Sequence, residues 1–341
     1  MRVSLSWLKE LVQVSEPVEE LAQRLSMAGF EEEEIDDLSA LAQGVVIGFV
    51  KEREKHPNAD KLSVCQVDVG GEEPIQIVCG AKNVRAGIHV PVAMVGAVLP
   101  AVNLTIKAGE LRGVASNGMI CSLSELGLAK ESDGIAVLDE FDTNLPAPGQ
   151  PVAPVLGLDD TVLDLAITAN RPDGLSMVGI AREVAALTSA PLSLPELTLL
   201  PPHESLPTTA DSAEAMAFGG LYGISLIDGV DGSMASPAWV QRRLSRAGIN
   251  RVNAVVDITN VVMLEQGQPL HAFDADALER ITGQAVDASS FGLRQAREGE
   301  RFTGLDDREL SLDSRAQVVT CHDQPIALAG VMGSKDSGVS S

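Results

Sequence analysis

The sequence lacks the features that identify membrane and secreted proteins. Every apolar run is shorter than the roughly 20 residues that a helix needs to span a bilayer. The first ten residues are amphipathic and contain no apolar core of the kind that a signal peptide requires. A hydrophobic fraction of 45% and a charged fraction of 21% are typical of a soluble globular protein, so we expect a cytoplasmic chain with no membrane contact.

Cysteine is also scarce, and its spacing excludes the common zinc and redox motifs. The four cysteines are Cys65, Cys79, Cys121 and Cys321, and none of them forms a Cys-x-x-Cys pair. No histidine lies at a zinc-ligand spacing from any of them. The sequence therefore predicts free, buried thiols in a reducing compartment and no metal site.

Positive charge is in short supply, with 25 Lys and Arg against 48 Asp and Glu and a net charge of −23. Residues 1–40 carry 3 basic and 10 acidic side chains, residues 41–150 carry 9 and 13, and the remainder carries 13 and 25. Phosphate contacts need Lys and Arg. Nucleic acid could therefore bind only to a local patch or with a partner's help, and an aromatic content of 3% leaves little for base stacking.

Periodicity in the first half of the chain predicts helices and strands in separate regions. Apolar residues at helical spacing over residues 18–25 predict a helix that ends at Gly29, and the acidic run Glu31–Glu34 is interpreted as a solvated face. Short β-branched runs separated by Gly and Pro predict a small barrel or sandwich. These runs are Val45–Ile47, Leu62–Val69, Ile75–Val78, His89–Val95 and Asn103–Ile106.

Prolines between Pro146 and Pro154 predict a boundary after the barrel. A strand over Val162–Ile167, a turn and a helix over residues 176–187 follow, and then a Pro-rich connector. In the last part of the chain, Ser236 and Pro237 are predicted to be the N-cap and first residue of a helix.

Three loop motifs lie within the predicted barrel, at His56–Leu62, Val78–Val84 and Leu111–Ser122. Asn and Gly make each of them a turn, and ordinary loops would explain any one alone. Together and in this order, they resemble the tRNA-binding domain shared by several aminoacyl-tRNA synthetases and their auxiliary factors, a five-stranded OB barrel. The resemblance implies contact with tRNA, and the low aromatic content favours recognition of the tRNA backbone or shape. It makes Lys61, Lys82 and Arg112 candidate contacts.

Two further motifs combine polar and apolar residues. In Asn170–Ser176, we favour a strand–turn–helix joint in which Arg171 pairs with an acid, ahead of a ligand site. Near the run Gln268–Asp274, Asp257 and the pair Thr259–Asn260 lie among apolar residues, and buried polar groups must be satisfied. A lone histidine such as His271 is more often a core residue, although a Thr-Asn pair beside it could also hold a water molecule.

These motifs, with the segment Ala327–Gly333, resemble the bacterial β-subunit family of phenylalanyl-tRNA synthetases over nearly the whole chain. The resemblance implies an α+β multidomain fold with a small α/β N-terminal domain, an inserted five-stranded OB-type β-barrel and a mixed α/β editing domain of the B3/B4 type. The expected bounds are 1–40 with 151–195, 41–150, a linker over 196–213, and 214–341. We expect the editing domain to be C-terminally incomplete at Ser341.

The resemblance also implies roles for single residues. Thr259, Asn260 and His271 would orient water and the ester of a mischarged tRNA, and Pro269, Ala329 and Gly330 would line the substrate pocket. Asn250-Arg251 stands where the family has Arg-Pro, so Arg251 is displaced by one residue, and Ser334 replaces the last glycine of Met-Gly-Gly. The family's pocket glutamate would lie beyond Ser341, so weak or absent editing is expected of this chain alone.

The densest positive group consists of Arg242, Arg243, Arg246 and Arg251. A tRNA-backbone contact, with Arg242, Arg246 and Arg251 as its main residues, and a solvated helix face are equally favoured.

The predicted function is that of the β-subunit portion of phenylalanine–tRNA ligase, an ATP-dependent aminoacyl-tRNA synthetase, contributing tRNA(Phe) binding and hydrolytic editing of tyrosyl-tRNA(Phe). The resemblance assigns aminoacylation, with its ATP and Mg²⁺, to the α subunit of an α₂β₂ heterotetramer. The sequence has no phosphate-cradling Gly loop, and no cofactor is expected on this chain. The alternatives are a stand-alone tRNA-binding or trans-editing factor and a non-catalytic scaffold for a partner subunit.

Overall fold

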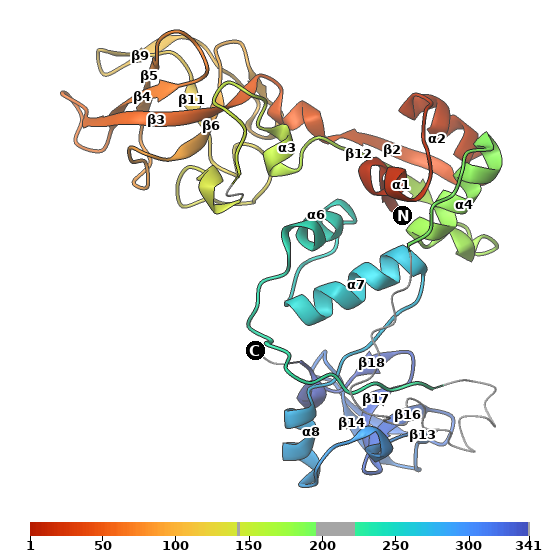
Figure 1. Cartoon of the computed structure of the whole chain (residues 1–341). Helices are drawn as coiled ribbons and strands as arrows, with labels where there is room; N and C mark the ends of the chain where they lie inside the picture. Colours follow the sequence, from red (N-terminus) through yellow and green to blue (C-terminus); the bar gives the residue numbers. More distant parts are fainter. Residues whose placement is uncertain (142–143, 196–221, 340–341) are drawn as a thin grey trace. The chain divides into compact units, whose positions relative to one another are not determined.

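The computed structural model of the chain describes residues 1–141, 144–195 and 222–339 (Figure 1). It divides into two compact units, the first comprising Met1–Pro172 with Glu183–Ala190 and the second Asp173–Arg182 with the chain from Pro191 on. The predicted linker, 196–213, lies outside the described residues. Over the residues described, none of the helices has the length and apolarity that a membrane crossing needs.

A three-stranded antiparallel sheet in the first unit combines strands from both sides of the barrel sequence. Its order is β1 (Arg2–Ser4), β12 (Thr161–Ala166) and β2 (Glu31–Asp37), with helices α1 (Leu5–Leu11) and α2 (Val18–Met27). Helix α4 (Met177–Thr188) is divided between the two units, with only its residues from Glu183 on in the first. The helix predicted to end at Gly29 is α2, and the strand predicted over Val162–Ile167 is β12, so both predictions are confirmed. The acidic run Glu31–Glu34, interpreted as a solvated face, opens the edge strand β2, whose charges discourage pairing with a second chain.

Arg171 ties the chain that follows the barrel to the chain that precedes it. Its guanidinium donates to the Glu183 carboxylate at 2.8 Å and to the Ala28 carbonyl at 3.0 Å. The same group lies 4.1 Å from the centroid of the Phe30 ring, a cation–π distance. The expectation that Arg171 pairs with an acid is therefore confirmed.

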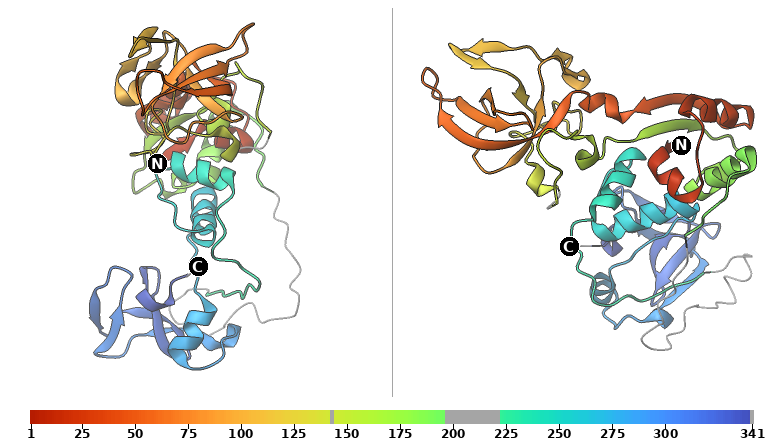
Figure 2. Two further views of the ribbon diagram at one scale, coloured as in Figure 1. Left: turned by 90° about the vertical axis from the view of Figure 1, so that its left-hand side faces the viewer. Right: turned by 45° about the horizontal axis from the view of Figure 1, so that its top comes forward.

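Five strands form the nearly closed OB-like barrel, in the order β11-β6-β3-β4-β5 (Figures 1 and 2). They are β3 (Val45–Lys55), β4 (Ser63–Asp68), β5 (Ile75–Cys79), β6 (His89–Ala93) and β11 (Met119–Ile120). The Asn117 N–H donates to the Gln76 carbonyl at 2.9 Å and so links the approach to β11 with β5, at the other edge of the sheet. The predicted run Asn103–Ile106 forms a separate short hairpin instead, and the fifth barrel strand is β11.

Buried apolar side chains fill the barrel, among them Val50, Ile77 and Val92. Two hairpins and a short helix flank it: β7 (Val98–Leu99) with β8 (Leu104–Thr105), β9 (Gly109–Leu111) with β10 (Val114–Ser116), and α3 (Ala153–Leu156). All four cysteines are free and buried, as predicted.

The second unit contains two helices that pack together and a sheet backed by a third helix. The helices are α6 (Ala238–Arg246), α7 (Ala254–Gln266) and α8 (Ala275–Thr282). The strands are β13 (Phe291–Gln295), β16 (Gln317–Cys321), β17 (Gln324–Leu328) and β18 (Met332–Gly333), in that order, with a ribbon of β14 (Glu300–Thr303) and β15 (Glu309–Leu312). Leu278 of α8 packs with Phe291, Val319 and Ile326 of the sheet to form its core.

The predicted capping of α6 is wrong in one respect. Pro237, not Ser236, occupies the N-cap position, and it makes no side-chain capping bond. The Ser236 hydroxyl donates instead to the buried carboxylate of Asp257 on α7, at 2.5 Å. Ser236 therefore lies one residue before the N-cap, and its side chain bonds to α7 instead of capping α6.

Candidate functional site

Two of the three barrel motifs are joined by a histidine whose ring nitrogens both have partners. His56 is 3% exposed; its Nδ1 accepts from the Asn58 N–H at 3.0 Å, and its Nε2 lies 3.0 Å from the Leu111 carbonyl. Asn58 then donates from its side chain to the Arg112 carbonyl at 3.1 Å. His56 and Asn58 thus hold the β9–β10 turn against the loop that follows β3.

The remaining barrel motif, Val78–Val84, lies beside the motif His56–Leu62. A side chain at Gly80 would touch Leu62, and Ser63 pairs with Cys79 across β4 and β5. Asn83 uses both ends of its amide on the backbone of Ile135, at 2.8 and 3.0 Å. The polar residues of the motifs therefore have structural roles that hold the loops in place.

The three predicted cations of the barrel are exposed on these loops. They are Lys61, Lys82 and Arg112. Arg112 has a positive φ of 52° and precedes Gly113, whose φ is 82°. Positive φ at both central residues is what a type I′ hairpin turn requires, so the β9–β10 turn presents Arg112 at its tip. The structure brings the three motif loops to one end of the barrel.

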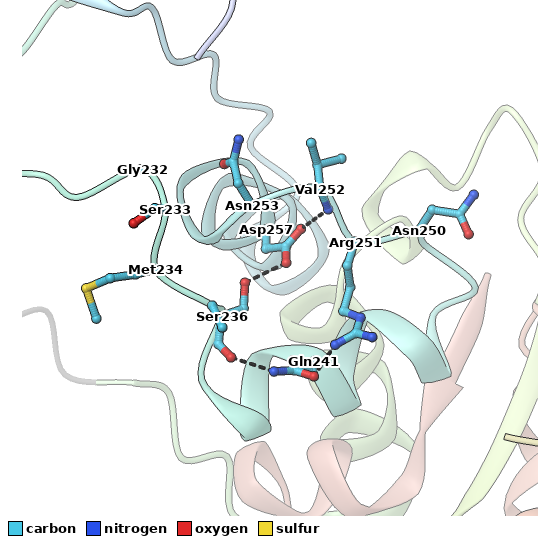
Figure 3. Close-up of a pocket in the computed structure, with 11 residues that line it drawn as sticks. Gly232, Ser233, Met234, Ser236, Gln241, Asn250, Arg251, Val252, Asn253 and Asp257 are labelled. Carbon is cyan, nitrogen blue, oxygen red and sulfur yellow. Dashed lines mark hydrogen bonds between the residues drawn. The ribbon is translucent and has the colours of Figure 1, made fainter. Parts of the chain in front are cut away.

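One member of the arginine group, Arg251, lines a hollow of about 960 Å³ in the second unit (Figure 3). Arg251 lies in its wall and donates to the side chain of Gln241 on α6. The buried Asp257 accepts from Ser236 at 2.5 Å and from the Val252 N–H at 2.9 Å, and so fixes the loop that carries Arg251. The hollow is polar, since Asn250, Asn253 and Gln241 also line it.

Arg242 and Arg246 are half-buried on α6. Arg243, between them in sequence, pairs with Glu265 of α7 at 3.3 Å, and its guanidinium lies 5.0 Å from the ring centroid of the exposed Trp239. Part of this arginine group therefore joins α6 to α7 and is not a freely solvated face.

Thr259 and Asn260 lie on α7, and both are half-buried. The Thr259 hydroxyl donates to the Val256 carbonyl of the same helix at 2.7 Å. Asn253 caps the helix by accepting from the Val256 N–H at 3.0 Å. Within the parts of the chain that the structure describes, no hydrogen bond joins Thr259 or Asn260 to His271.

His271 is seated between an aromatic ring and a strand end. Its ring centroid lies 4.6 Å from that of Phe273, with the planes at 67°, an edge-to-face contact. A Cβ on Gly333 would lie only 2.8 Å from His271 Cε1 and Nε2, so the imidazole packs directly on the backbone of β18. Loss of hydration in this position lowers the pKa of His271 below its usual value.

The predicted pocket residues Ala329 and Gly330 occupy the turn between β17 and β18, and the exposed Pro269 lies in the segment after α7. Gly330 has a φ of 69°, and a Cβ there would meet nothing within 4 Å. The His271 ring therefore packs against β18, a strand of the hairpin whose turn carries Ala329 and Gly330.

Phe273 and Gly333 are the residues near this histidine that were not predicted as site residues. Both lie inside the runs that carry the family resemblance. The signal for Gly333 was the absence of a side chain in an otherwise strand-like segment, which often marks a close approach. The partner in that approach lies far away in sequence and could not be read from it.

Known protein families match both parts of the chain. A model described as a putative tRNA binding domain matches residues 45–144, and one described as a B3/4 domain matches residues 220–341. The phenylalanine–tRNA ligase beta subunit of Parasynechococcus marenigrum strain WH8102 is 81% identical over 99% of this chain, and that of Synechococcus sp. strain CC9605 is 73% identical over 99%. The matched regions cover 42% and 41% of these relatives, so the chain spans about two fifths of their length.

Among solved structures, a MetRS-related protein from Pyrococcus horikoshii matches 32% of this chain and 87% of its own, at 25% identity and a TM-score of 0.21. So small an overlap carries no argument about the fold.

Proposed function

Because this chain belongs to the family of phenylalanine–tRNA ligase β subunits, we propose that it contributes tRNA(Phe) binding and the hydrolytic editing of tyrosyl-tRNA(Phe) to that ligase. We propose that the predicted domain bounds, 1–40 with 151–195, 41–150 and 214–341, divide these tasks. The barrel binds tRNA, and the last domain edits.

The proposal for the barrel is supported by three exposed cations on loops at one end. Phosphate binding needs such groups in an otherwise acidic chain. The strained backbone of Arg112, held by Asn58, keeps its side chain at the tip of a hairpin, where an RNA backbone can reach it. Arg242, Arg246 and Arg251 of the second unit are proposed as separate contacts with the tRNA backbone.

The proposal for editing rests on one observation, the seat of His271 against the hairpin of Ala329 and Gly330. A lowered pKa keeps the imidazole neutral near pH 7, so that a ring nitrogen can accept a proton from water as the ester carbonyl is attacked. Thr259 and Asn260 are proposed to orient that water and the ester. The open space at Gly330 would receive the aminoacyl ring, with Pro269 and Ala329 beside it.

ATP and Mg²⁺ are proposed to act on the α subunit of an α₂β₂ assembly. In residues 1–141, 144–195 and 222–339, no three His, Cys, Asp or Glu side chains gather in a way that could hold a metal ion. No step of the proposed editing reaction is routed through a metal ion. A cytoplasmic location follows from the proposed role in translation.

Binding of tRNA(Phe) to residues 1–341 at several salt concentrations tests the role of the barrel. Changing Lys61, Lys82 or Arg112 to Ala should reduce the salt slope by about 1 for each phosphate that is no longer neutralised. Arg301→Ala is the matched control, since that exposed arginine lies on the ribbon β14–β15, outside every proposed contact. Equal slopes for all four variants would show that the barrel does not bind tRNA through these residues.

Deacylation of tyrosyl-tRNA(Phe) by the assembled ligase tests the editing role. His271→Ala should lower the rate about 10²-fold or more and leave phenylalanylation intact, because general acid–base groups contribute on that scale. An unchanged deacylation rate would remove His271 from the reaction. Editing by the chain of residues 1–341 alone, compared with that of the assembled ligase, would distinguish a stand-alone factor from a subunit.

A further inference from the structure

Gly333 lies where the polypeptide comes closest to the His271 ring. A Cβ built there would lie 2.8 Å from both Cε1 and Nε2 of that ring, a distance that real Cβ atoms do not show. The neighbouring Leu305 Cδ1 would be at 3.4 Å, an ordinary contact. Any residue other than glycine at position 333 must therefore displace either the imidazole or the backbone.

The backbone at Gly333 is held on two sides. Gly333 pairs with Ala327 across β17 and β18, and its carbonyl accepts from the Leu305 N–H at 3.2 Å. The next residue, Ser334, donates its N–H to the Ile326 carbonyl at 2.9 Å. The imidazole, at the end of a side chain that can rotate, is the softer of the two neighbours and is the group that must move.

The segment that carries His271 is also anchored. Phe273 packs against Phe291 in the core of the sheet, with ring centroids 6.2 Å apart. The Asp274 N–H lies 3.3 Å from the carbonyl of Ser337, a fully buried residue. Only the side chain of His271 is then left to respond to an added atom at position 333.

We propose that Gly333 is a positioning residue, whose missing side chain seats the His271 imidazole between Phe273 and β18, at a fixed place relative to the Ala329–Gly330 turn. The strand that receives the imidazole also ends that turn, so one hairpin sets both the ring and the wall of the pocket. The proposal deepens the editing function and rests on it for its catalytic consequence. The seating itself can be tested without catalysis.

The test uses Gly333→Ala in residues 1–341, with the His271 resonances followed by NMR across pH. Displacement into water should return the pKa of His271 toward about 6.5. In the assembled ligase, deacylation of tyrosyl-tRNA(Phe) should fall between about tenfold and a hundredfold in kcat, since a misplacement of about 1 Å costs on that order. The KM for that tRNA and phenylalanylation should be unchanged.

Gly299→Ala is the control for a general loss of stability, because Gly299 lies in the same unit at a φ of 75° and a Cβ added there would meet nothing within 4 Å. It should cost about 1 kcal/mol of stability through backbone strain and leave the His271 titration unchanged. Phe273→Leu, which removes the other wall of the seat, should shift the titration in the same direction as Gly333→Ala.

Two results would overturn the proposal: a His271 titration unaffected by Gly333→Ala, or the same shift in Gly299→Ala. Failure of the editing function is a different result. If only the editing function is wrong, the His271 titration shifts in Gly333→Ala while His271→Ala leaves deacylation unchanged. In the double variant of Gly333 and His271, the absence of a further loss beyond His271→Ala would show that Gly333 acts through the histidine.

Discussion

Replacing Arg171 by Ala should loosen the sheet of the first unit more than any surface change does. The substitution leaves the Ala28 carbonyl without its donor and the Glu183 carboxylate without its partner, and it removes the packing on Phe30. A hydrogen bond to a charged group contributes about 1.5–3 kcal/mol, and a cation–π contact about 0.5–2 kcal/mol. The ion pair itself adds little, because both side chains are more than a fifth exposed, at 26% and 21%.

The expected loss is roughly 3 kcal/mol, about a hundredfold in the opening equilibrium of the sheet. Hydrogen exchange of the buried β12 residues Leu163 and Leu165 measures that opening locally, and urea unfolding measures it globally. Arg171→Lys should lose only part of the protection, since Lys retains the charge but not the fork of donors. If Arg171→Ala leaves exchange in β12 as slow as in Arg301→Ala, the interactions of Arg171 contribute no stability and the reasoning is wrong.

Three further predictions follow from single interactions. Glu300→Gln should destabilise the second unit at pH 7, and the difference from wild type should fade below about pH 4.5. The Arg294 hydrogen bonds lower the pKa of Glu300 in the folded state. Their stabilisation is therefore present above the unfolded-state pKa and is lost as the pH falls through the folded-state pKa. Urea titrations at pH 7 and pH 3 would detect this loss. Burial raises the pKa of Cys121 to about 12, so a thiol reagent at pH 8 should modify that thiol only on unfolding, as peptide mapping would reveal. Asp257→Ala should cost about 2–3 kcal/mol by leaving the Ser236 hydroxyl and the Val252 N–H unsatisfied, whereas Asp257→Asn should cost less; equal losses in urea unfolding would contradict this account.

Local periodicity predicted the elements whose apolar faces meet the core. The helix α2, the strand β12 and most barrel strands were predicted, because burial on one face imposes a pattern on the sequence. The edge strand β2 was not predicted. Glutamate is depleted in strands, and only the partner strand β12 holds Glu31–Asp37 extended. Likewise, β11 is two residues long, too short to show any alternation.

The candidate site also has a part that the sequence predicted and a part that depends on tertiary contacts. Its residue types could be read from the sequence, since His271 and the Ala329–Gly330 pair lie in runs with a family resemblance. The spatial neighbours could not be read, because Gly333 meets His271 only where the segment after α7 packs against β18 in the folded chain. Ser236 makes the same point, since its hydroxyl serves the remote Asp257 and not the adjacent helix end.

The pairing of β2 with β12 has a consequence for the whole barrel. Asp37 and Thr161 are directly opposite each other in the register, at the end of one strand and the start of the other. Residues 38–160 therefore enter and leave the sheet at neighbouring points, as the loop of a β-hairpin does. A short turn in their place would still close the hairpin, because long insertions with adjoining ends cost little closure entropy. In topology, the barrel is a domain inserted between the two strands of one hairpin. It could be deleted or exchanged without changing the order or connectivity of the strands in the sheet.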